Sequence, residues 1–334
     1  MSTEGTTSLA AAEPPSASPR GLSRRLRVEF DLGFLIGALV LLIVVMSLAS
    51  PFFLTSRNIQ ELLFQTSVLA IVSFGVTVVI ISGNFDLSVG AGVGLVGIVV
   101  AEIALKSGSL VVGLLCGLGV GLAIGLINGI ASTALAIPSF IVTLAMLVIC
   151  RGLALTITHG QTAFGFPGGL SDFIGSDFLG LKVAVWIALI VLVSVHCLMR
   201  YTRLGIQIYA VGGNAAAARV SGLPVKRIQT AAFVVSGLCV AVAAVVLLGR
   251  VDAAQPTAGM NLELFGVAAV VIGGASLYGG RGSVLRTALG VLLIAILQNG
   301  LTLQGVSTDL ANVILGVVLM IAASSGVWRA RRSR

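Results

Sequence analysis

Apolar runs long enough to cross a lipid bilayer recur along the chain from residue 33 almost to its end. A membrane-spanning helix needs about 20 mostly apolar residues, and in lipid the backbone must satisfy its own hydrogen bonds. Hydrophobic residues make up 57% of the chain and charged residues only 10%, unlike soluble domains. We therefore predict an all-α, polytopic membrane protein with about ten transmembrane helices, at about 33–50, 62–82, 87–105, 110–131, 139–158, 182–199, 230–249, 265–279, 286–303 and 309–328.

The basic residues are distributed unevenly between the predicted loops. Ten crossings place both termini on one side, where 15 of the 20 Lys and Arg fall; four fall on the other side and Arg151 lies within a helix. Basic residues accumulate in cytoplasmic loops, so both termini are predicted to be cytoplasmic. We expect a disordered basic tail at 1–30, a transmembrane domain at 31–328 and a basic tail at 329–334.

Residues 201–228 form the one long polar and basic segment inside this apolar chain. Asn214 is a good N-cap, Ala215 to Arg219 favour a helix, and Gly222 suits the left-handed position after a helix end. Pro224 would stop any continuation. Because so short a helix is marginal by itself, it needs packing against its own chain or in a groove on a partner. The local pattern also fits a plain cytoplasmic loop.

Two similar short segments enter helices in opposite halves of the chain. Asn84-Phe85-Asp86-Leu87 precedes a helix interrupted by several glycines, and Asn261-Leu262-Glu263-Leu264 precedes a short helix that carries Gly273-Gly274. The segments are five helices apart and so lie on opposite faces of the membrane. Glycine-interrupted helices at matching positions of an inverted repeat indicate a transport path at the repeat interface. A four-residue similarity also arises by chance.

Three ionisable residues lie within or beside the predicted spans. Asp86 and Glu263 either cap the N-terminus of the helix that follows or contact a ligand. Arg151 either extends its side chain to the membrane surface, pairs with an acid, or lines a wet cavity.

Several neutral polar residues also interrupt the apolar helices. They form hydrogen bonds between helices or contact a polar cargo, and such a path suits an uncharged, hydroxyl-rich solute better than an ion. The residues predicted for a translocation path are Asn84, Asp86, Ser88, Asn128, Arg151, Asn261, Glu263 and Asn299.

Glycine recurs at every fourth position in the helix at 110–131. Residues four apart share one face of a helix, and small residues let helices pack closely in lipid. The predicted packing face comprises Gly113, Gly117, Gly121, Gly125 and Gly129.

The chain lacks the sequence motifs of nucleotide-binding and hydrolytic enzymes. It contains no G-x-x-x-x-G-K-[ST], H-E-x-x-H or G-x-S-x-G pattern. We expect no catalytic residues, no metal site and no cofactor in this chain. Its four cysteines lie inside apolar runs without metal-ligand spacing, so no disulfide is expected.

Four stretches together resemble the ribose-type permease subunits of bacterial ABC importers, a group related to the branched-chain amino-acid permeases. They are Val-Ile-Ile-Ser-Gly-Asn-Phe-Asp-Leu-Ser-Val-Gly at 79–90, and the stretches that begin Ile-Pro-Ser-Phe at 137–154, Ala-Val-Gly-Gly-Asn at 210–222 and Ala-Ala-Val-Val-Ile-Gly-Gly at 268–282. They occur in order in a chain of suitable length. The pair Asn84-Phe85 departs from the pattern, where sugar permeases more often have Gly and an aliphatic residue.

The resemblance implies a multi-pass subunit of the bacterial inner membrane that imports a monosaccharide or similar polyol. It implies a second permease chain, a cytoplasmic ATPase that binds ATP and Mg²⁺, and a periplasmic or lipid-anchored binding protein. By position, 214–222 resembles the coupling helix that sits in the ATPase groove. The residues implied in coupling are Asn214, Ala215, Ala216, Ala217, Ala218, Arg219, Ser221 and Gly222.

Two other functions are compatible with parts of the sequence. An ion-coupled secondary transporter would use Asp86 and Glu263 as proton carriers and would need no ATPase. A membrane-embedded enzyme is disfavoured by the missing catalytic motifs.

Overall fold

A computed structural model describes residues 20–307 and 309–317, with side chains from residue 32 onward. The regular secondary structure of its described part consists of helices and one two-stranded hairpin, joined by non-helical connections. The helices are α1 (Arg20–Ala49), α2 (Ser56–Ile81), α3 (Val89–Ser107), α4 (Leu110–Thr133), α5 (Ser139–Thr158), α6 (Leu170–Gly175), α7 (Val183–Tyr201), α8 (Arg203–Gly213), α9 (Ala215–Val220), α10 (Val225–Val251), α11 (Leu262–Ile272) and α12 (Val284–Leu303). The hairpin pairs β1 (Asp177–Phe178) with β2 (Leu181–Lys182) in antiparallel register.

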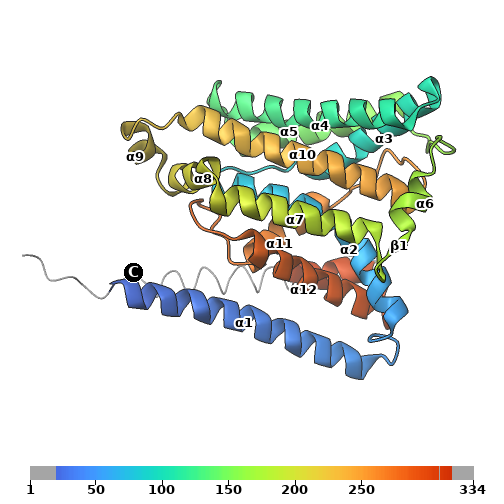
Figure 1. Ribbon diagram of the computed structural model, residues 1–334, viewed down its shortest axis with the longest axis horizontal. Helices are drawn as coiled ribbons and strands as arrows, with labels where there is room; N and C mark the ends of the chain where they lie inside the picture. The colour runs from blue at the N-terminus through green and yellow to red at the C-terminus, as the bar shows by residue number, and fades with distance from the viewer. Residues whose placement is uncertain (1–19, 308, 318–334) are drawn as a thin grey trace, which may run out of the picture.

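The centre of the bundle is formed by α2, α3 and α10. Every residue of α2 from Thr66 to Ile81 is buried, as expected for a helix that is apolar on all sides. α10 packs against α2, α3 and α4, whereas α2 also contacts α7, α11 and α12. Figure 1 shows α4 and α5 along one edge of the bundle and α1 along the opposite edge, beside α12.

The glycines of α4 lie against two neighbouring helices. A Cβ on Gly113 or Gly117 would overlap atoms of α3, and a Cβ on Gly121, Gly125 or Gly129 would overlap backbone or Cβ atoms of α10. At the crossing with α10, the partner is itself a glycine, Gly237. Without side chains between them, the two backbones can approach closely, which strengthens dispersion contacts in lipid.

The connecting elements collect at two opposite ends of the bundle (Figure 1). At one end lie α8 and α9, between α7 and α10; at the other lie α6 and the β1–β2 hairpin. Within the hairpin, Lys182 pairs with Asp177 at 3.2 Å, and the Trp186 indole donates a hydrogen bond to the Phe178 carbonyl at 2.8 Å. The stretch at 159–181, between two expected spans, is therefore partly structured.

Within the described residues, eight helices are long and apolar enough to cross a membrane. The expected span at 265–279 is wrong, because α11 has 11 residues and ends at Ile272. Gly273 and Gly274 follow, and the left-handed Gly274 (φ +80°) turns the chain, as glycine commonly does after a helix end. The structure does not confirm ten spans. The tenth expected helix is described only at 309–317, and the rest of it lies outside the described residues.

Two further boundaries differ from the sequence prediction. α1 begins at Arg20, so part of the tail expected to be disordered at 1–30 is helical; its Arg and Leu residues are good helix formers. Residues 1–19 and the basic tail at 329–334 lie outside the described residues. The predicted loop at 201–228 also contains α8, which the sequence analysis did not predict.

Candidate functional site

A non-helical segment, Ser82–Ser88, joins α2 to α3 inside the helix bundle. Ser82, Asp86 and Ser88 in this unwound segment are buried, with exposed fractions of 2% or less. Non-helical backbone at membrane depth is tolerated only where protein groups satisfy it or where it lines a cavity. The unwound segment therefore needs hydrogen-bond partners from the surrounding helices.

Side chains from α5 and α10 bond to the backbone of the unwound segment. Ser139 Oγ accepts from the Phe85 N–H at 3.1 Å, and Thr143 Oγ1 approaches the Phe85 carbonyl oxygen at 3.4 Å. Gln229 Nε2 donates to the Ser82 carbonyl at 3.3 Å. None of these three residues was predicted from the sequence. Ser139 and Thr143, four residues apart in the first, otherwise apolar part of the helix, were the available signal.

Asp86 is the centre of a buried hydrogen-bond network. Its Oδ1 accepts from the Ser88 backbone N–H at 3.1 Å and from Ser88 Oγ at 2.6 Å, and its Oδ2 accepts from Ser236 Oγ at 2.9 Å. Asn128 Nδ2 donates to Ser88 Oγ at 2.8 Å. No basic side chain within the described residues forms an ion pair with Asp86. Hydroxyl and amide donors therefore compensate much of the cost of burying this carboxyl group.

The Asp86 network lies well inside the bundle. Thr133 near the end of α4 and Thr230 on α10 bring their hydroxyls within 3.1 Å. Ser236 follows Thr230 by six residues, which is about 9 Å along a helix axis. The network thus joins α3, α4 and α10 below the end of the bundle. Ser236, a lone hydroxyl in an apolar run, was also missed by the sequence analysis.

The N-terminal ends of α3 and α11 meet. A Cβ on Gly90 would overlap a carboxylate oxygen of Glu263 and the carbonyl oxygen of Gly259, and a Cβ on Gly94 would lie 2.8 Å from the Ala258 carbonyl oxygen. Asn261, immediately before α11, is left-handed (φ +68°). Glu263 occupies the first turn of α11, where the helix dipole favours a negative charge. The two similar sequence segments therefore bring their helix starts together.

Arg151 joins the same cluster from α5. Its Nη1 donates to the Pro256 carbonyl at 2.8 Å and to the Ala258 carbonyl at 3.3 Å. Arg151 is half-buried and lies 12 residues beyond the start of the 20-residue α5. One carboxylate oxygen of Glu263 is buried without a hydrogen-bond partner in the described part of the chain. Partly exposed ionisable groups at this depth favour a wet or protein-covered face over bare lipid.

Asn299, in contrast, bonds to a residue outside the predicted path. Asn299 and Asn58 exchange two side-chain hydrogen bonds of 2.9 Å, which join α12 to α2. Reciprocal amide bonds of this kind hold membrane helices together. The structure therefore favours helix association over cargo contact for Asn299.

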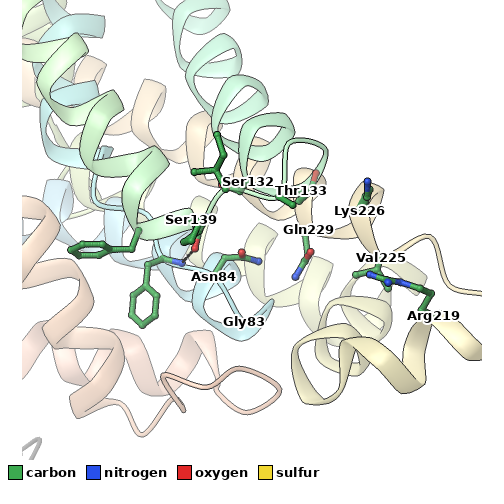
Figure 2. Close-up of a pocket in the computed structure, with 14 residues that line it drawn as sticks. Gly83, Asn84, Ser132, Thr133, Ser139, Arg219, Val225, Lys226 and Gln229 are labelled. Carbon is green, nitrogen blue, oxygen red and sulfur yellow. Dashed lines mark hydrogen bonds between the residues drawn. The ribbon is translucent and has the colours of Figure 1, made fainter.

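A pocket of about 700 Å³ opens beside the unwound segment at the end of the bundle that carries α9. Figure 2 shows Asn84 and Ser139 on one side, Arg219 and Lys226 on the other, and Gln229 between them. Its lining contains neutral polar and basic side chains but no acidic one. Asn84, one of the predicted path residues, lines this pocket, and its side-chain amide donates to Ser82 Oγ at 3.1 Å.

The short helix predicted at 214–222 is present as α9. Asn214 Oδ1 accepts from the Ala217 N–H at 2.9 Å, and Gly222 is left-handed (φ +81°), so both predicted caps are confirmed. Ala218 is buried, whereas Arg219 is exposed. α9 therefore rests its Ala218 side on its own chain and presents Arg219 outward.

The comparisons with known proteins identify the family. Residues 58–323 match the family model described as the permease component of the branched-chain amino acid transport system. The chain belongs to this permease family. It is 41% identical over 303 residues to the ribose import permease protein RbsC of Bacillus subtilis, covering 89% of this chain and 94% of that protein.

Two further relatives carry other cargo names. The D-allose transport system permease protein AlsC of Escherichia coli is 34% identical over 279 residues, covering 83% of this chain and 86% of that protein. The L-arabinose ABC transporter permease protein AraH of Azospirillum brasilense is 34% identical over 295 residues, covering 88% and 87%. No solved structure shows significant similarity to the chain.

Family membership and the eight apolar helices establish a multi-pass protein of the inner membrane. It is a transport subunit rather than an enzyme, and subunits of this family work with an ATPase and a binding protein.

Proposed function

We propose that this chain imports a monosaccharide or similar polyol as the permease of an ABC transporter. The observation that carries the proposal is its similarity, over more than four-fifths of its length, to permeases named for ribose, allose and arabinose. The neutral hydroxyls and amides around the unwound segment support an uncharged, hydroxyl-rich cargo. The exact sugar is left to experiment.

The proposed path runs past the junction of α3 and α11. An inverted repeat with cytoplasmic termini would place the two helix starts at the repeat interface, where transporters commonly bind cargo. The cluster that contains Arg151 and Glu263 and the pocket beside Asn84 would then both lie on the path of the cargo. In this arrangement α8 and α9 lie on the cytoplasmic side, in agreement with the basic residues around them.

The energy is proposed to arrive through α9 from a partner. The sequence has no P-loop, so ATP and Mg²⁺ would bind to a cytoplasmic ATPase subunit. Asn214 to Gly222 would sit in a groove on that ATPase, which would supply the packing that a six-residue helix needs. A second permease chain and an extracytoplasmic binding protein complete the proposed importer.

The ion-coupled alternative is less well supported. A proton carrier must exchange its proton with water on each side in turn. Asp86 instead has an exposed fraction of 2%, and three donors contact its carboxyl group. The relatives are named as ABC or import permeases, which does not favour this alternative either.

Reconstitution into liposomes tests the proposed function. The chain is assembled with the ATPase and binding protein encoded with it, and uptake of radiolabelled D-ribose, D-allose and L-arabinose is measured with and without ATP. We expect one of these sugars to accumulate only when ATP and all subunits are present. Uptake driven by a pH gradient without the ATPase would instead establish the ion-coupled mechanism, and no uptake of any of the three would show that the cargo differs from the sugars named for these relatives.

Arg151→Gln tests the proposed path. The variant removes the charge that holds the carbonyl oxygens of Pro256 and Ala258. We expect uptake to fall by about tenfold, corresponding to about 1.4 kcal/mol for a lost hydrogen bond to a charged group. Arg151→Lys, which keeps the charge, serves as control. Wild-type uptake by Arg151→Gln would show that this face is not part of the path.

A further inference from the structure

Three chain segments meet backbone to backbone between α8 and the unwound segment. They are Ile81–Gly83 at the end of α2, Gly212–Gly213 at the end of α8, and Gly279–Gly280 in the loop between α11 and α12. The Gly280 N–H donates to the Ile81 carbonyl at 2.9 Å. We call this set the glycine junction. It lies immediately before Asn84 in the chain, and α9 follows it directly on the other side.

Gly212 is the tightest point of the glycine junction. A Cβ there would overlap the Ile81 carbonyl oxygen and lie 2.8 Å from the Gly280 nitrogen, the two atoms that form the hydrogen bond. Gly83, Gly279 and Gly280 have positive φ, but Gly212 does not. Only close approach therefore requires glycine at Gly212. The adjacent Gly213 has room for a Cβ, with a single neighbouring atom at 4.0 Å.

Two side chains reinforce the same contact. Tyr209 on α8 donates its hydroxyl to the Gly282 carbonyl at 2.9 Å, and burial raises the Tyr209 pKa above its usual value, so the hydroxyl keeps its proton. Gln229 near the start of α10 donates to the Ser82 carbonyl at 3.3 Å. Tyr209 thus attaches α8 to the loop between α11 and α12, and Gln229 attaches the start of α10 to the segment that leads into the Asp86 network.

This geometry has a mechanical consequence. Only Asn214 separates the end of α8 from the start of α9, so a partner that moves α9 also moves the end of α8. Close-packed backbone has little room to absorb such a shift by changing side-chain rotamers. A displacement of α8 therefore passes to Ile81–Gly83, where the unwound segment begins, and from there to Asp86 and the start of α3.

We propose that Gly212 and its contacts with Ile81 and Gly280 transmit movement of α9 to the unwound segment that contains Asp86. Gly212 is a positioning residue in this role and does not contact cargo. The inference rests on the proposed function, since it assumes that an ATPase moves α9. It adds the physical link between that movement and the path.

Gly212→Ala, with Gly213→Ala as matched control, tests the inference in the complete transporter with its ATPase and binding protein. The readouts are ATP hydrolysis without binding protein, its stimulation by binding protein loaded with the sugar that the wild type imports, and uptake of that sugar. We expect Gly212→Ala to assemble and hydrolyse ATP but to lose about fivefold or more in both stimulation and uptake, the lower end of common coupling strengths. Gly213→Ala should match the wild type.

Tyr209→Phe provides a second test that adds no atoms. It removes only the hydrogen bond to Gly282, so it decides the question if Gly212→Ala fails to assemble. We expect basal hydrolysis to persist while stimulation and uptake fall together. The inference would be overturned if Gly212→Ala and Gly213→Ala showed equal stimulation and uptake. If Gly212→Ala does not assemble, wild-type stimulation and uptake in Tyr209→Phe would overturn it. If the wild-type complex shows no ATP-dependent uptake, the proposed function fails and this inference fails with it.

Discussion

Gly125→Ala and Gly119→Ala, two identical substitutions on α4, should have different effects on stability. A Cβ on Gly125 would overlap the Phe233 carbonyl oxygen on α10 and lie 3.0 Å from the Val234 Cα. These are backbone atoms, so α4 and α10 must separate to accommodate the methyl group. Gly119 lies on the exposed side of the same helix, where a Cβ meets nothing within 4 Å.

The comparison isolates the packing cost. Both substitutions gain the same intrinsic helix preference of Ala over Gly, so that contribution cancels in the difference between them. Inserting a carbon into a well-packed contact typically costs about 1–3 kcal/mol. The free energy of unfolding should therefore be lower for Gly125→Ala than for Gly119→Ala by about 1–3 kcal/mol, a factor of about 5 to 150 in the equilibrium constant.

The measurement is unfolding of the purified chain in mixed detergent micelles as the fraction of SDS is raised, followed by circular dichroism. Tryptophan fluorescence provides a second probe, because a difference between the two transitions would reveal an intermediate. Equal midpoints and slopes for Gly125→Ala and Gly119→Ala would refute the close α4–α10 contact. Greater stability of Gly125→Ala would refute it as well.

Two further substitutions test the coupling segment and the buried network. Ala217→Pro removes the N–H that bonds to Asn214 and should reduce binding of the ATPase in a pull-down assay. The control Ala215→Pro changes the first helical position, where proline is tolerated, and should bind the ATPase like the wild type. Equal binding by the two variants would reject the capped helix as the contact. Ser236→Ala removes a donor to the Asp86 carboxyl group and should lower the free energy of unfolding by about 1.5–3 kcal/mol in the same SDS titration. An unchanged midpoint would show that this bond does not stabilise the fold.

Helix capping around α9 was predictable because its determinants are local. Asn214 accepts a hydrogen bond from the N–H of Ala217, only three residues further on. Gly222 adopts a left-handed conformation because glycine has no Cβ, which is a property of the residue itself. α8 was missed for the opposite reason. Its glycines and polar residues give it a weak helix pattern, and Gly212 is helical in a tightly packed environment.

The path residues illustrate a similar division. Asp86, Ser88 and Asn128 stood out as polar residues in apolar surroundings, and the structure joins them in one network. Their partner Ser236 comes from 150 positions further along the chain. Asn299 stood out equally but pairs with Asn58 elsewhere. A polar residue in a membrane sequence indicates that it needs a partner, but it does not identify the partner.

The sequence by itself determined that the chain is a helical membrane protein, where most helices lie, and which family it belongs to. Lipid imposes these features locally: each span must be long, apolar and internally hydrogen-bonded. Only the tertiary structure decided that α11 ends at Ile272, that the starts of α3 and α11 meet at Gly90 and Glu263, and that Gly212 contacts Ile81 and Gly280. Such contacts join residues far apart in the chain, and they depend on which backbones can approach each other, a property that residue type alone does not encode.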